Sequence, residues 1–86
     1  MAAPYPYADR QFQADAFIRK ELREAITRFP AFRSPHEGLA IIEEEFLEFR
    51  QEVFHGTRER QEAEAIQLAA MAIRFLIDIS YQQEGR

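Results

Sequence analysis

Apolar side chains recur at spacings of three and four residues in three stretches of the chain, which is the pattern of amphipathic helices. The first stretch predicts a helix from about residue 9 to residue 28, with Asp9 as its N-cap and Pro30 beyond its end. The apolar stripe of this helix consists of Phe12, Ala16, Phe17, Leu22, Ile26 and Phe29. Residues 1–8, which contain two prolines, are expected to form an extended arm.

A start signal of several residues precedes the second stretch. Ser34 as the N-cap, Pro35 as the first helical residue and Glu37 as the returning partner of a capping box predict a helix from residue 35 to about residue 55. Gly56 is placed to end this helix as a C-terminal cap. The apolar residues that predict its core face are Leu39, Ile42, Phe46, Phe49 and Val53.

The third predicted helix runs from residue 58 to about residue 82, with Thr57 as its N-cap. Its middle, residues 63–79, is apolar nearly all round, so most of its sides should be buried. A monomer of three helices has too little other surface to cover it. We therefore expect an all-α, antiparallel helical bundle that forms one domain, residues 1–86, and completes its core as a homodimer or homotetramer.

Composition narrows the classes of function. The chain of 86 residues has no cysteine, which excludes disulfides, a thiolate nucleophile and cysteine zinc sites. A net charge of -4 argues against a nucleic-acid partner. The N-terminus lacks the basic and apolar segments of a signal peptide, and the most apolar segment is interrupted by charged residues. We therefore expect a soluble, cytoplasmic protein without a membrane partner.

Glutamates gather on the second predicted helix. At 100° per residue, Glu45, Glu48 and Glu52 form a strip beside the predicted core face, Glu44 lies next to Glu48, and Glu43 points elsewhere. Converging carboxylates repel one another and raise their pKa values. A hard divalent cation such as Mg²⁺ removes this repulsion and keeps water on its remaining positions. The alternative, left open by the pattern, is a solvated helix face.

The third predicted helix carries a polar stripe, which consists of Glu64, Gln67, Met71, Arg74 and Asp78. Polar groups inside an otherwise apolar helix need a partner or a function. Arg74 and Asp78 stand four residues apart, so one interpretation is that they pair with each other. If the last two helices are antiparallel, Glu64 and Gln67 face the end of the second helix, near Glu48. The two helices would then form a carboxylate site of the kind found in helical bundles.

These residues resemble a known family. Glu44-Glu45-Phe46-Leu47-Glu48, followed by Glu64-Ala65-Ile66-Gln67, resembles the E-E-x-x-E and E-x-x-D motifs of the MazG-like all-α nucleoside triphosphate pyrophosphohydrolases. The resemblance extends over about residues 33–78 and is closer to small bacterial and phage members. It implies an oligomeric helical fold that uses Mg²⁺, with Mn²⁺ as an alternative. The implied reaction converts a nucleoside triphosphate to a monophosphate and pyrophosphate.

The resemblance also implies roles for individual residues. The implied metal ligands are Glu44, Glu45, Glu48, Glu64 and Gln67. Gln67 departs from the family, which has an aspartate there, and its uncharged amide weakens the site for Mg²⁺. Either Glu45 or Glu48 would orient or deprotonate the attacking water. The candidates for binding phosphates are Arg74, Arg33 and Lys20, each of which has the alternative of being a surface or paired cation.

The departure at Gln67 keeps a second function open, a non-catalytic helical module for dimerisation or partner binding with a vestigial site. A helical protein that handles iron or manganese ranks last. Bundles of that kind carry a Glu-x-x-His motif on each of two helices, and two such motifs are not present.

Overall fold

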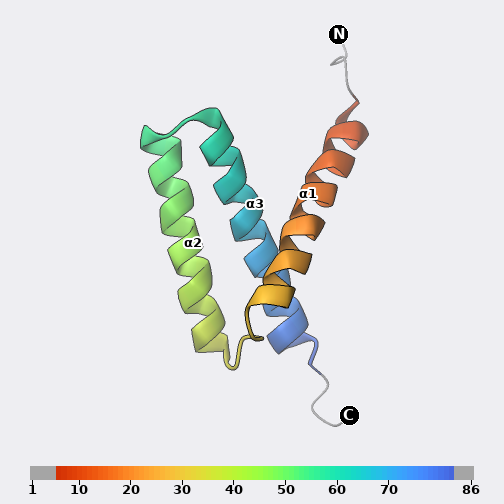
Figure 1. Ribbon diagram of the computed structural model, residues 1–86, viewed down its shortest axis with the longest axis vertical. Helices are drawn as coiled ribbons and strands as arrows, with labels where there is room; N and C mark the ends of the chain where they lie inside the picture. Colours follow the sequence, from red (N-terminus) through yellow and green to blue (C-terminus); the bar gives the residue numbers. More distant parts are fainter. Residues whose placement is uncertain (1–5, 83–86) are drawn as a thin grey trace.

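The computed structural model describes residues 6–82, and all regular structure among them is helical. The elements are α1 (Tyr7–Arg28), α2 (Pro35–His55), α3 (Arg58–Phe75) and the π-helical segment η1 (Leu76–Ser80). Figure 1 shows α2 and α3 as an antiparallel hairpin, whereas α1 runs in the same direction as α3 and crosses it near its C-terminal end. The all-α prediction is confirmed, and the antiparallel arrangement holds for α2 and α3. In the described part, no helix is long and apolar enough to cross a membrane.

The predicted bounds of α2 are confirmed, and one of the two hydrogen bonds of the predicted capping box is observed at its start. Ser34 Oγ accepts a hydrogen bond from the Glu37 N–H at 3.1 Å. The return bond differs from the prediction, because Glu37 Oε1 accepts from the N–H of Arg33 at 2.6 Å. The same carboxylate also binds the Arg33 guanidinium, at 3.0 Å, so the charged side chain draws Glu37 to the residue before the N-cap.

The outer ends of α1 and α3 differ from the prediction. α1 begins at Tyr7 instead of residue 9, and its N-cap is Pro6, whose carbonyl accepts the Asp9 N–H at 3.0 Å. Asp9 is therefore a first-turn residue, where its charge suits the helix dipole. Residues 1–5 of the expected arm lie outside the described residues. At the other end, the helix stops at Ser80 instead of residue 82, after a π-helical turn in which the Tyr81 N–H donates to the Leu76 carbonyl.

The rotation of α2 against its neighbours is set by Gly38. A Cβ atom at this position would lie 2.6 Å from a ring carbon of Phe75, so the close approach requires glycine. Ile41 and Ile42 consequently pack against a small core, which is centred on Ala25, Phe32, Ala70 and Met71. Three residues of the predicted core face of α2 lie outside the core of the single chain, because Leu39 is 56% exposed and both Phe46 and Val53 are 47% exposed.

The apolar stripe predicted for α1 also differs from the observed packing. Leu22 packs against the core as expected, together with Ile18. Phe12 and Phe17 remain exposed in the single chain, as do Ile26 and Phe29. For Phe12 and Phe17 the reason is the crossing geometry, since α1 meets α3 only over its C-terminal half (Figure 1).

A buried ion pair fixes the end of α1 and the linker to α3. Arg74 is only 3% exposed, and its Nε donates to Asp78 Oδ2 at 2.9 Å. Its terminal nitrogens donate to the carbonyls of Ala25 at 2.9 Å and Phe29 at 2.7 Å. Asp78 Oδ2 also accepts the backbone N–H of Phe32 at 2.9 Å. The expected pairing of Arg74 with Asp78 is confirmed, and it connects segments that lie far apart in the sequence.

Candidate metal centre

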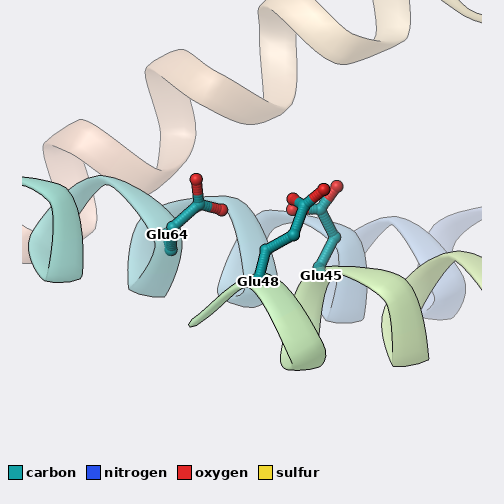
Figure 2. A group of neighbouring side chains, drawn as sticks. All are labelled: Glu45, Glu48 and Glu64. Carbon is teal, nitrogen blue, oxygen red and sulfur yellow. The ribbon is translucent and has the colours of Figure 1, made fainter. Parts of the chain in front are cut away.

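Three glutamates from two helices meet where α2 and α3 run side by side. Glu45 and Glu48 lie one turn apart on α2, and Glu64 lies near the start of α3. Each offers a carboxylate oxygen, and these oxygens all lie within 4.8 Å of one another. Figure 2 shows the carboxylates of Glu45 and Glu48 side by side and that of Glu64 directed to the same space. The antiparallel hairpin thus brings together residues that sequence spacing places on different helices.

The burial of these carboxylates leaves oxygens without partners. Glu45 and Glu64 are half-buried, whereas Glu48 is exposed. The Oε1 atoms of Glu45 and Glu64 are buried and have no hydrogen-bond partner. A buried acceptor without a partner costs free energy, because it has lost its water and gained nothing in return. A proton or a cation placed among the three carboxylates would remove this cost.

The pKa values of the cluster also indicate that it favours a proton or a cation. Burial, and to a smaller extent the charges of Glu48, Glu64 and Glu44, together raise the pKa of Glu45 to about 7. Burial also raises the pKa of Glu64, with additional contributions from Glu48 and Glu52. Near neutral pH, therefore, the site readily accepts positive charge.

The raised pKa of Glu45 predicts a pH-dependent stability for the metal-free protein. The unfolded carboxyl ionises around its ordinary value of 4.5, whereas the folded one ionises at about 7. Between these values the folded state holds the extra proton, so raising the pH through this window destabilises the fold. In EDTA, the melting temperature is expected to fall from about pH 5 to about pH 8.

The matched variants for this measurement are Glu45→Gln, which is permanently neutral, and Glu62→Gln, which changes an exposed glutamate outside the cluster. Glu45→Gln is expected to flatten the fall in melting temperature, and Glu62→Gln to preserve it. A melting temperature that stays constant or rises through the window in the unsubstituted protein would contradict the assignment.

Arg60 is a neighbour of the cluster that the sequence analysis missed. Its Nε lies 3.4 Å from Glu52 Oε1, and its charge acts to lower the pKa of Glu64. Together with Glu48 and Glu64 it lines an open hollow of about 460 Å³ on the outer side of the cluster. Its position four residues before Glu64, on the same face of α3, is a signal that the sequence did contain.

A larger cavity opens on the other side of Glu45, between α1, the linker, α2 and α3. Its volume is about 690 Å³, within the usual range of small-molecule sites. Apolar and aromatic side chains make up much of its wall: Ala25, Phe29, Phe32, Ile41 and Met71. The acidic cluster thus stands between an apolar cavity and a charged surface hollow.

Two of the expected metal ligands lie differently from the other three. Gln67 lines the cavity, and its Nε2 donates to Glu21 Oε2 of α1 at 2.8 Å. Glu44 lines both the cavity and the hollow and acts on the pKa of Glu45, but it is not part of the group within 4.8 Å. Glu21 was not predicted, and it is separated from Gln67 by 46 residues, so no spacing rule indicated it.

The three expected phosphate-binding cations all have partners within the chain. Lys20 Nζ lies 2.9 Å from the carboxylate of Glu24 and lines a separate hollow on α1. Arg33 is paired with Glu37. It lines the large cavity together with Arg74, whose guanidinium is held by the internal hydrogen bonds described above. Of the three, Arg33 is the exposed cation beside the cavity.

In comparisons with known proteins, no family model, no curated protein and no solved structure matches this chain.

Proposed function

We propose that this chain is a Mg²⁺-dependent nucleoside triphosphate pyrophosphohydrolase, which converts a nucleoside triphosphate to a monophosphate and pyrophosphate. The observation that carries the proposal is the convergence of the Glu45, Glu48 and Glu64 carboxylates within 4.8 Å. The resemblance of the two acidic motifs to those of the MazG-like enzymes supports it independently.

The residues of the cluster fit a hard divalent cation. The donors are carboxylate oxygens, which Mg²⁺ prefers, and two of them are buried without a partner. Glu48 and Glu64 are proposed as ligands of the cation. Glu45 is proposed as a further ligand that also serves as the base. Glu44 lines the outer hollow beside them. When bound, the ion would neutralise charge on the phosphates and position them for attack by water.

Glu45 is the better candidate for the general base. In the metal-free chain its pKa is raised to about 7. A cation bound among the carboxylates would lower this pKa, so the carboxylate of Glu45 would be ionised and available as a base near neutral pH. It also borders the cavity, so a water held by its carboxylate would face a substrate placed there. Gln67 would then act beside the nucleoside, because it lines the cavity and its Nε2 donates to Glu21 of α1.

The two hollows suggest an orientation for the substrate. The apolar cavity suits a base and sugar, since its wall includes Phe29, Phe32 and Met71. The outer hollow is lined by four glutamates as well as Arg60, so it would suit the released pyrophosphate as a complex with the cation. The cluster between them would then bind the phosphates that are to be separated.

The test is to incubate the full chain with each common and modified nucleoside triphosphate and to measure pyrophosphate release with Mg²⁺, with Mn²⁺ and with EDTA. Release that requires the metal, together with metal binding in calorimetry, is the expected result. Metal binding without release would favour the alternative, a non-catalytic binding module. Absence of both would overturn the enzymatic proposal and favour a plain helical module.

A further inference from the structure

One face of α2 is covered by exposed apolar side chains. We use the name exposed face of α2 for seven exposed residues on one side of the helix: Leu39, Glu43, Phe46, Leu47, Arg50, Val53 and Phe54. Leu39, Phe46 and Val53 are about half-exposed, as described above. Leu47 is 58% exposed and Phe54 is 65% exposed. Single exposed apolar residues are ordinary, but a contiguous group along one helix indicates an interaction surface.

The pattern on this face repeats every seven residues. A step of seven returns to within about 20° on a helix, so Leu39, Phe46 and Val53 form one ridge. Leu47 and Phe54 form a second ridge, and Glu43 and Arg50 lie between the two. Heptad spacing is what two helices need to stay in contact along their length. The partner that fits this face is therefore a helix.

We propose that the exposed face of α2 binds the same face of a second copy of this chain. The two α2 helices would run antiparallel, about a two-fold axis that passes between Phe46 and Leu47. This axis places Glu43 opposite the partner's Arg50, and Arg50 opposite the partner's Glu43. It also places Leu39 opposite the partner's Phe54 and Phe46 opposite the partner's Leu47. One axis thus matches both the charges and the apolar side chains.

The charges select a second copy over other helices. A two-fold interface must be complementary to itself, and this face carries one negative and one positive group at equal distances from its centre. A parallel pair would place Glu43 against the partner's Glu43 and Arg50 against the partner's Arg50. A shifted antiparallel pair would leave charges against apolar side chains, which is costly when they are buried.

Exposed apolar side chains are not confined to α2, since Ile73 near the end of α3 and Leu76 in η1 are exposed as well.

The test is the oligomeric state of the full chain, measured by sedimentation without metal or nucleotide. The unsubstituted protein is expected at twice its 10.1 kDa mass. Glu43→Arg and Arg50→Glu each place two pairs of like charges across the axis, and each is expected to raise the dimer dissociation constant at least about tenfold. Combining the two substitutions restores opposite charges, and the constant should return to within about threefold of the original.

A protein that sediments as a monomer at every concentration would overturn the proposal. A dimer that both single variants leave unchanged, or that the combined variant fails to restore, would overturn this axis. If a reversed charge unfolds the chain, as judged by circular dichroism, Arg50→Gln and Glu43→Gln are the substitutes. Each is expected to weaken the dimer, and no weakening by either would also overturn the axis. None of these outcomes involves the acidic cluster, so the proposed hydrolysis stands or falls separately.

Discussion

Replacing Glu48 with glutamine is expected to reduce metal-dependent pyrophosphate release at least about 100-fold. The substitution keeps the size of the side chain but removes one of the three converging charges that would hold the cation. Because Glu48 is exposed, the fold should be unaffected, and circular dichroism would verify this. Metal affinity measured by calorimetry should fall together with the rate, since both depend on the same carboxylate.

The matched control is Glu62→Gln, which makes the same change in charge at an exposed position of α3 outside the cluster. It should retain release within about threefold, in keeping with a distant surface substitution. Equal losses in both variants, or full activity in Glu48→Gln, would contradict the role of the cluster. The comparison thereby distinguishes the loss of a metal ligand from the loss of one negative charge anywhere on the surface.

Replacing Arg74 with methionine is expected to destabilise the fold by about 3–5 kcal/mol. The substitution retains much of the side-chain volume but leaves Asp78 as a buried charge without its partner. It also leaves the carbonyls of Ala25 and Phe29 without the donor that binds them at 2.9 and 2.7 Å. For a domain of this size, the melting temperature should fall by more than about 12 °C.

Lys20→Met provides the control, because the pair of Lys20 with Glu24 is exposed and one helical turn apart. Exposed pairs contribute about 0–1 kcal/mol. Melting curves of both variants at one chain concentration would compare them, since self-association shifts apparent stability. A loss below about 1 kcal/mol in Arg74→Met would show that the buried pair does not anchor α1 and the linker to α3.

The local features of the fold were predictable because they depend on residues a few positions apart. The start of α2 is set by Ser34, Pro35 and Glu37, and its predicted bounds are those observed. The cap of α3 at Thr57 is likewise observed, with its hydroxyl accepting the Arg60 N–H at 3.2 Å. The pairing of Arg74 with Asp78 follows from a separation of one helical turn.

The rotation of α2 was not predictable from periodicity. Leu39, Phe46 and Val53 have the spacing of a core face, but so do Ile41 and the partly buried residues beside it. Gly38 decided between these faces by admitting the ring of Phe75. A single chain also does not distinguish a core face from a face that meets a second copy, because the same apolar heptads serve both purposes.

The sequence by itself determined the helices, their caps and the acidic strip on α2, because these follow from helical geometry over one or two turns. The tertiary structure alone decided which carboxylates meet, through the way α2 packs on α3. It also decided the contacts of Gln67 with Glu21, and of Arg74 with the end of α1, whose partners lie 45 to 49 residues away. No spacing rule reaches so far, since only packing brings such residues together.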